Sequence, residues 1–256
     1  MKKLMILSVL LAGSAAQAAL DWGGSAAIFG PAGDSSWTNP NSWRDQVDAL
    51  PGIPVAGDTL FIQRYAWGNE GVPGGGWDTG AVGPTLDTTI AGLADVYLAT
   101  QDTVPIVGGQ IAELNLVSGA DLSANNLLMG RVANSTATLN MSGDATASFG
   151  GFFLPIDGTA SATINMNDSA DLTINALAGT TFWSIVMDAD AVLTINNAPP
   201  GWENLNITAK NAGDSIQATN LGGAAYEYVV IPEPATIGLL SMAGGALVLL
   251  RKRYMI

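Results

Sequence analysis

Aspartate recurs at a fixed spacing in the middle of the chain, and this spacing offers one route to acid–base chemistry. Asp121, Thr146 and Asp171 follow one another at equal intervals. If each interval is one layer of a stack with about 4.8 Å between layers, the carboxylates of Asp121 and Asp171 stand about 9.6 Å apart. That separation lies at the upper edge of the range for the acid and base of inverting glycosidases.

The same alternation has a structural explanation, which we favour. A second set of positions, Asp144, Ser169 and Asp190, also alternates carboxylates with a hydroxyl. Like charges directly opposite each other destabilise a strand ladder, so stacked strands tolerate Asp only on alternate layers. We therefore expect no catalytic residue in this chain, and the acid pair remains the basis of an enzymatic alternative.

The composition excludes several other kinds of active site. The sequence contains no Cys and no His, so it has no thiolate nucleophile, no Ser-His-Asp triad and no His/Cys zinc site. A metal ion would need oxygen ligands, as Ca²⁺ and Mg²⁺ do. We expect neither a cofactor nor a metal site. Without disulfides, stability must come from packing or from a repeated ladder.

The charge distribution argues against nucleic acid as a partner. The formal net charge is −13, from 9 basic and 22 acidic residues. Five of the basic residues lie at the two ends of the chain. Those between the ends are Arg44, Arg64, Arg131 and Lys210. A body so poor in cations is repelled by phosphate backbones, so we expect no nucleic-acid binding.

The opening segment, 1–18, has the three parts of a secretory signal peptide. Lys2 and Lys3 form a positive start, and a short apolar run follows over 4–11. Ala16-Gln17-Ala18 is an A-x-A-like cleavage site, which predicts a cut between Ala18 and Ala19. The apolar run is too short to be a membrane anchor. The sequence therefore predicts an exported protein.

An uninterrupted uncharged run, 235–250, lies close to the end of the chain. As a helix it would be about 24 Å long, against about 30 Å for the hydrocarbon core of a membrane. It predicts a marginal transmembrane helix, with a basic stop that fits the positive-inside rule. The basic stop consists of Arg251, Lys252 and Arg253.

A Pro-Glu-Pro motif precedes this run and consists of Pro232, Glu233 and Pro234. Proline keeps the residue before it out of the helical region, so this segment should be extended. The order of the motif, the apolar helix and the basic stop in 230–256 resembles the PEP-CTERM sorting signal of exported bacterial proteins. The resemblance implies processing by an exosortase-type membrane enzyme, passage through the inner membrane and a destination at the cell surface or outside the cell. It also implies an association with exopolysaccharide.

Four similar stretches follow one another in the middle of the chain. "LNLVSGADLSAN" from Leu114, "LNMSGDATASFG" from Leu139 and "INMNDSADLTIN" from Ile164 begin at equal intervals, and "IVMDADAVLTIN" follows after a shorter interval at Ile185. Within each copy, apolar residues alternate with polar ones, which is the period of a strand. A third apolar piece follows in two copies, at 127–129 and 152–154, and suggests three short strands in each copy.

This repeat predicts an all-β fold, a right-handed parallel β-helix (solenoid) over 90–229. We expect an N-terminal cap with a Gly/Pro-rich loop over 19–89 and a single C-terminal transmembrane helix. An antiparallel β-sandwich is the alternative, but it does not require the same register in successive copies. The body also resembles the β-helical repeats of autotransporter-type surface proteins, with "TLNMSGD" as the local feature.

Two groups of residues in the body have competing interpretations. Asn115, Asn140 and Asn165 align in the repeat, and we expect them to form a ladder of amide hydrogen bonds. Trp37 and Trp43 lie before the repeat. They either cover the apolar end of the solenoid, which we favour, or stack against the sugars of a glycan.

We therefore expect an exported, non-enzymatic cell-surface or extracellular-matrix protein. One alternative is a polysaccharide lyase or glycoside hydrolase built on a β-helix. Lyases of this fold typically need a basic residue beside bound Ca²⁺, and Arg131 is the only cation within the four aligned copies. Another alternative is an adhesin or glycan-binding module that uses Trp37 and Trp43.

Overall fold

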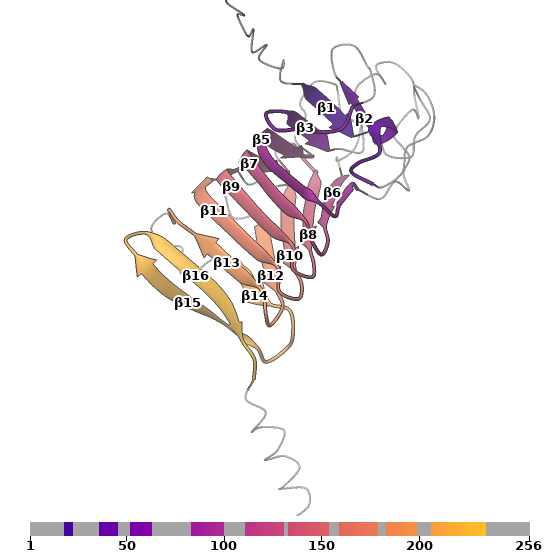
Figure 1. Ribbon diagram of the computed structural model, residues 1–256. Helices are drawn as coiled ribbons and strands as arrows, with labels where there is room; N and C mark the ends of the chain where they lie inside the picture. Colours follow the sequence, from indigo (N-terminus) through magenta and orange to yellow (C-terminus); the bar gives the residue numbers. More distant parts are fainter. Residues whose placement is uncertain are drawn as a thin grey trace, which may run out of the picture.

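The computed structural model describes residues 18–22, 36–45, 52–62, 83–99, 111–130, 133–153, 159–178, 183–198 and 206–233. Within these ranges the chain is an all-β parallel solenoid, and it contains no α-helix there (Figure 1). One 3-10 turn, η1, spans Pro40–Ser42. The predicted transmembrane helix at 235–250 lies outside the described residues.

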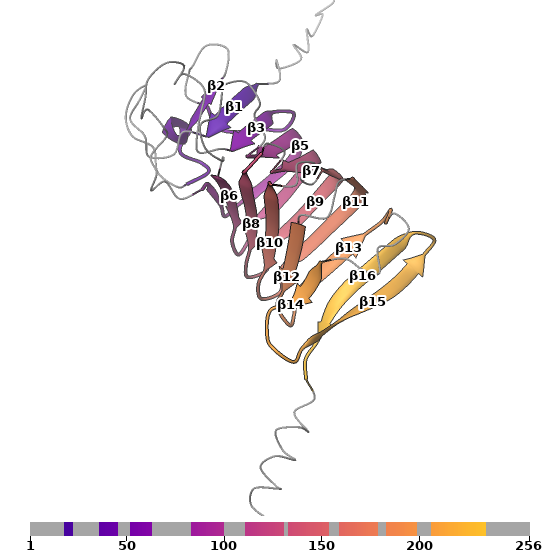
Figure 2. The same ribbon diagram turned by 180° about the vertical axis from the view of Figure 1, so that it is seen from behind.

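Two sheets form the solenoid, and they lie against each other along its length (Figures 1 and 2). The first is ten-stranded, in the order β15-β16-β13-β11-β9-β7-β5-β3-β1-β2. Its strands are β1 (Ala19–Trp22), β2 (Trp43–Asp45), β3 (Thr59–Ile62), β5 (Thr89–Leu98), β7 (Asp121–Met129), β9 (Thr146–Phe153), β11 (Asp171–Ala178), β13 (Val192–Ile195), β15 (Ser215–Gly222) and β16 (Ala225–Ile231).

The second sheet is six-stranded, in the order β14-β12-β10-β8-β6-β4. Its strands are β4 (Thr85–Leu86), β6 (Ile111–Leu116), β8 (Thr136–Met141), β10 (Ser161–Met166), β12 (Trp183–Met187) and β14 (Ile207–Ala209). From β4 to β13 the chain alternates between the two sheets. From β5 to β12, each strand pairs in parallel with the equivalent strands of the coils before and after it.

Residues that occupy the same position in successive sequence copies lie opposite each other in the sheet. Leu114 lies opposite Leu139, Leu139 opposite Ile164, and Ile164 opposite Ile185. The shorter spacing of the last copy is absorbed outside the strands, because β10 and β12 keep the same register. The parallel β-solenoid predicted from the repeat is therefore confirmed, and the β-sandwich alternative is wrong.

The core is a stack of apolar side chains between the two sheets. Along β6, β8 and β10 alternate residues are buried, so one face of each strand points inward. The inward positions at the ends of these three strands, Leu116, Met141 and Met166, are fully buried and form a continuous column across the coils. Burying such a side chain contributes about 1.5–3 kcal/mol.

The third apolar piece is not a separate strand, which corrects the prediction of three strands in each copy. It continues β7 beyond a bend, where Asn125 is exposed and Leu127 returns to the core. The neighbouring strand β9 has Gly150 and Gly151 at this bend. A Cβ atom at Gly150 would lie 2.6 Å from the carbonyl oxygen of Asn125, so the close stacking of the bend requires glycine there.

The two ends of the solenoid depart from the parallel pattern. β1 and β3 extend the first sheet in parallel, so the region predicted as a cap, 19–89, contributes strands to the same sheet as the repeats. β2 then closes this end as an antiparallel strand. At the other end, β15 and β16 form an antiparallel hairpin on β13. The predicted boundary at 229 falls within β16, which ends at Ile231.

The predicted Asn ladder is present on the outer face of the second sheet. The Asn140 side-chain amide donates to Asn115 Oδ1 and to Glu113 Oε1, each at 2.9 Å, and Asn165 donates to Asn140 Oδ1 at 2.7 Å. These bonds join three successive coils. They place Asn140 at the centre of a polar chain whose members satisfy one another.

Replacing Asn140 with Ala should lower the free energy of unfolding by about 1–3 kcal/mol, because its neighbours lose their partners on a half-buried surface. Urea denaturation measures this difference. Thr138→Ala is the matched control, since Thr138 lies on the same face of β8, is also half-buried and has no side-chain hydrogen bond to a described residue. Equal losses in the two variants would contradict a specific role for the Asn ladder.

Candidate functional site

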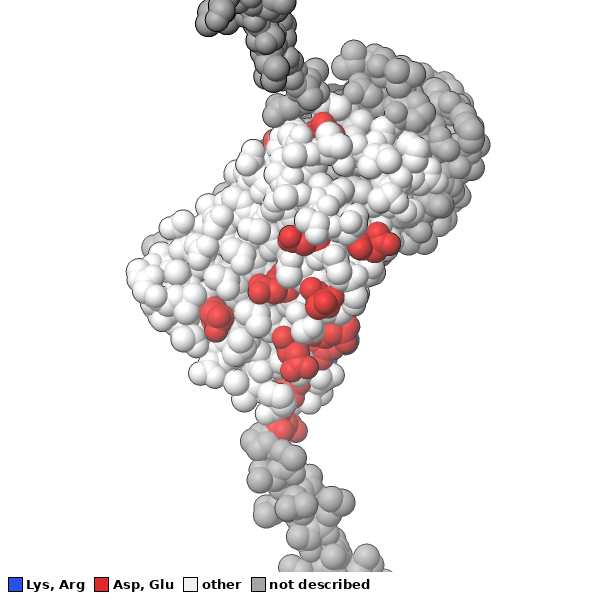
Figure 3. Space-filling model, in the orientation of Figure 1, with Lys and Arg blue, Asp and Glu red and all other residues white. Residues whose placement is uncertain are grey.

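Acidic side chains gather along one side of the solenoid, over the turns that join the two sheets (Figure 3). Several of them bind the backbone of the coil before them. Asp144 accepts a hydrogen bond from the Gly119 amide at 2.8 Å, and Asp168 accepts one from the Gly143 amide at 3.0 Å. Consecutive turns are thereby joined by charge-assisted hydrogen bonds, which are about twice as strong as neutral ones.

The proposed acid pair, Asp121 and Asp171, lies in one column on the outer face of the first sheet. Thr146 stands between them, directly opposite each in the register. The Thr146 hydroxyl donates to Asp121 Oδ1 at 2.8 Å. The predicted alignment is confirmed. The Thr146 hydroxyl is hydrogen-bonded to one carboxylate of the pair, that of Asp121.

Asp171 differs electrostatically from its neighbours. Partial burial raises the pKa of its carboxyl group, and the negative charge of Glu227 on β16 raises it further. Glu227 reaches this site because the hairpin β15–β16 closes over the last parallel strand. Its effect on Asp171 could not be predicted from the repeat, since β16 lies outside the repeated part.

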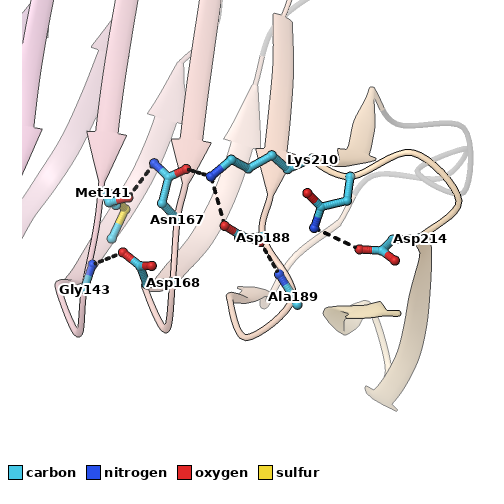
Figure 4. Close-up of polar contacts among 9 residues, drawn as sticks. Met141, Gly143, Asn167, Asp168, Asp188, Ala189, Lys210 and Asp214 are labelled. Carbon is cyan, nitrogen blue, oxygen red and sulfur yellow. Dashed lines mark hydrogen bonds and ion pairs between the residues drawn. The ribbon is translucent and has the colours of Figure 1, made fainter. Parts of the chain in front are cut away.

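Lys210 forms a polar cluster with residues of two other turns (Figure 4). Its ammonium group lies 2.9 Å from Asp188 Oδ2 and 2.8 Å from Asn167 Oδ1. The hydrogen bond from Lys210 is the main cause that lowers the pKa of Asp188, followed by the amide of Ala189. Asn167 donates in turn to the carbonyl of Met141 at 3.3 Å. The cluster therefore joins the last coils of the solenoid.

Lys210 was not predicted as a site residue from the sequence. The sequence spacing indicates that these residues are neighbours, because Asn167, Asp188 and Lys210 follow one another at nearly equal intervals. Extending the repeat by one copy, into β14, would have placed Lys210 next to Asp188. The polar partners in this cluster are already bound to one another, and the ion pair is partly exposed. Such pairs contribute about 0–1 kcal/mol.

Trp37 and Trp43 are fully buried at the N-terminal end of the core. Their rings meet edge to face with centroids 4.9 Å apart, and Trp43 Nε1 donates to the Trp37 carbonyl at 2.9 Å. The Trp37 amide donates to the carbonyl of Thr85, which attaches the pair to the solenoid. Neither ring has an exposed face for a sugar, so the structure contradicts glycan contact at these residues and supports the cap.

Asp58 is a buried carboxylate that sequence reasoning missed. Its Oδ1 accepts from the Ala18 amide at 3.0 Å and its Oδ2 from the Val55 amide at 2.9 Å. The Ala18 carbonyl accepts from Thr59. The predicted cleavage site, Ala18 and Ala19, therefore lies where the chain joins the folded body, and Ala19 is the first residue of β1.

The predicted sorting motif begins where the folded body ends. Pro232 and Glu233 follow β16 directly and are exposed, with no helical structure. The Glu233 amide donates to Asp214 Oδ1 at 3.0 Å. Pro234 and the basic stop, Arg251, Lys252 and Arg253, lie outside the described residues.

The part of the chain that the structure describes contains neither a metal-binding cluster nor a membrane-spanning helix. No three acidic side chains there lie close enough together to hold a metal ion. None of the described elements is a helix long and apolar enough to cross a membrane. Comparison with known proteins finds no matching family model, no matching curated protein and no matching solved structure.

Replacing Asp171 with Asn should raise the melting temperature at pH 7. The raised pKa means that the folded state disfavours the ionised carboxylate, so its cost is present above the pKa and disappears as the pH falls. The gain should therefore vanish below about pH 3.8, the ordinary value for Asp. Thermal unfolding followed by circular dichroism across this pH range measures the effect.

Asp121→Asn is the matched control for this experiment. It removes a charge from the same column, but its side chain accepts the Thr146 hydrogen bond in the native protein. This variant should show no comparable gain at pH 7. A melting temperature for Asp171→Asn at or below that of the native protein would contradict the electrostatic argument.

Proposed function

We propose that the chain is an exported, non-enzymatic cell-surface or extracellular-matrix protein, sorted through a C-terminal PEP-CTERM-like segment. The observation that carries this proposal is the position of the motif. Pro232 and Glu233 emerge, exposed, from the end of the solenoid opposite Ala18 (Figure 1). In this arrangement a processing enzyme reaches the motif without unfolding the body.

The proposal also includes the handedness of the coil, the two terminal segments and the partners. The body is a right-handed coil, as parallel β-solenoids with this repeat commonly are. A signal peptide over 1–18 directs export, and a transmembrane helix over 235–250 holds the protein in the inner membrane during sorting. The partners are an exosortase-type membrane enzyme and an exopolysaccharide of the cell surface.

A non-enzymatic role is supported by what four of the described carboxylates do. Asp144 and Asp168 bind backbone amides of neighbouring turns, Asp58 does so in the core, and Asp121 accepts from Thr146. These groups hold coils together. A general acid or base would instead need to be available to a substrate atom within hydrogen-bonding reach. We therefore do not propose the lyase or hydrolase alternative.

The proposal is tested by replacing Pro232, Glu233 and Pro234 with Ala in the full chain. We expect the variant to accumulate in the inner-membrane fraction, because the processing enzyme no longer recognises an extended segment there. Fractionation with immunoblotting measures both the location and the size of the protein.

A variant with Asp87 and Thr88 replaced by Ala is the matched control, since both are exposed residues between β4 and β5. This variant should follow the native protein. If the motif variant also keeps the native size and destination, the sorting proposal fails.

A further inference from the structure

The solenoid ends in four sheet edges, and they differ in how they are protected against further strand pairing. β4 has two residues and is bridged by Ser36. β14 has three residues and is followed by the charged Lys210. β2 has three residues, of which two are charged. Short edge strands and charged residues are the usual means of preventing association between sheets.

The fourth edge, β15, lacks this protection. It has eight residues, SIQATNLG, without a charge or a proline. All of its side chains are exposed except Ile216, which is half-buried. Exposed Leu221 lies at one end of the strand, and exposed Ile231 lies opposite Ser215 at the other.

The backbone of β15 is paired on one side only. It forms an antiparallel ladder with β16, and no described strand lies on its other side. In an antiparallel strand, alternate residues direct their N–H and C=O groups away from the partner. The Gly222 amide is bound locally by Asn220 Oδ1 at 2.7 Å. The middle of the strand thus offers a row of backbone donors and acceptors to another strand.

We propose that β15 pairs antiparallel with β15 of a second copy of this chain. An antiparallel pair of identical strands has a two-fold axis, so each copy supplies both the donors and the acceptors that the other needs. The proposal does not depend on the proposed function.

Charge does not oppose a second copy at this edge, whereas it does over most of the surface. The chain as a whole carries a net charge of −13, so most contacts between copies bring like charges together. β15 contains no charged residue, so two copies can meet there without placing like charges opposite each other. Since opposite residues of a ladder share a face, Ala218 can lie opposite Ala218 of the second copy, with Gln217 opposite Thr219.

Such pairing makes one continuous sheet from two solenoids joined end to end. It places the exits of the two C-terminal segments at opposite ends of the seam, because Ile231 lies opposite Ser215 at the start of β15 and the two β15 strands run antiparallel. The partly buried Ile216 of β15, which packs against the core, would gain cover from the second copy.

The absence of cysteine from the chain allows a direct test. Single substitutions Ser215→Cys, Gln217→Cys, Ala218→Cys, Thr219→Cys and Leu221→Cys are introduced into the full chain, which is purified in mild detergent and oxidised. A disulfide needs Cβ atoms about 3.5–4.5 Å apart. We expect disulfide-linked dimers to be most abundant for Ala218→Cys, at the centre of the strand, or for the variants next to it.

Cross-linking should be lost at Ser215→Cys, because antiparallel pairing about Ala218 separates the two copies of residue 215 by about 20 Å. Thr208→Cys on β14 is the control for random collisions, since Thr208 is also exposed at a sheet edge. A uniform profile along β15, or a yield equal to that of Thr208→Cys, would overturn the proposal.

A second experiment separates pairing from a general loss of folding. Gln217→Lys with Thr219→Lys places like charges opposite each other in the pair, and the corresponding double substitution to Glu does the same. Each variant alone should be monomeric by light scattering at concentrations where the native chain is dimeric. Mixing the two should restore a dimer. A monomeric native chain, or a mixture that stays monomeric, would refute the proposal.

Discussion

The whole structure depends on one constraint, the parallel pairing of equivalent residues in successive coils. Because Leu114, Leu139 and Ile164 lie opposite one another, every inward position continues a column of the core and every outward position continues a ladder. The same register brings Asn140 beside Asn115 and Thr146 beside Asp121. A shift by one residue would exchange the two faces and expose the core. The polar ladders and the apolar columns therefore stabilise the same register.

This constraint explains how an acidic chain without disulfides can form long stacks. Stacking brings equivalent side chains close together, so carboxylates at equivalent positions of adjacent coils would repel one another. The sequence separates Asp121 from Asp171 with Thr146, and it uses the turn carboxylates Asp144 and Asp168 as acceptors for backbone amides. The acidic side of the molecule is thus also part of what holds the coils together.

The central coils could be predicted from the sequence, because identical residue types recur at the interval that the register requires. The Asn ladder followed from the same alignment. The bend at Asn125 could not be predicted from the alignment, since Leu127 and its neighbours have the composition of a separate strand. In the structure they continue β7, and Gly150 and Gly151 of β9 stack against the bend. The closing hairpin β15–β16 was also missed, although Gly222 and Gly223 between two alternating stretches are a hairpin signal. Composition placed Trp37 and Trp43 near the end of the solenoid, but it did not show their burial or the backbone bond from Trp37 to the distant Thr85.

The opposite positions of Ala19, at the start of β1, and Glu233 give the molecule a particular response to force. Tension applied between these points acts along the axis of the solenoid, so it loads the hydrogen bonds between coils one layer after another instead of shearing all of them together. Since each coil contacts only its neighbours, the end coils would peel away first. Each released copy of the repeat would lengthen the chain by up to about 80–90 Å. The body would therefore behave under load as an extensible tether that yields in steps.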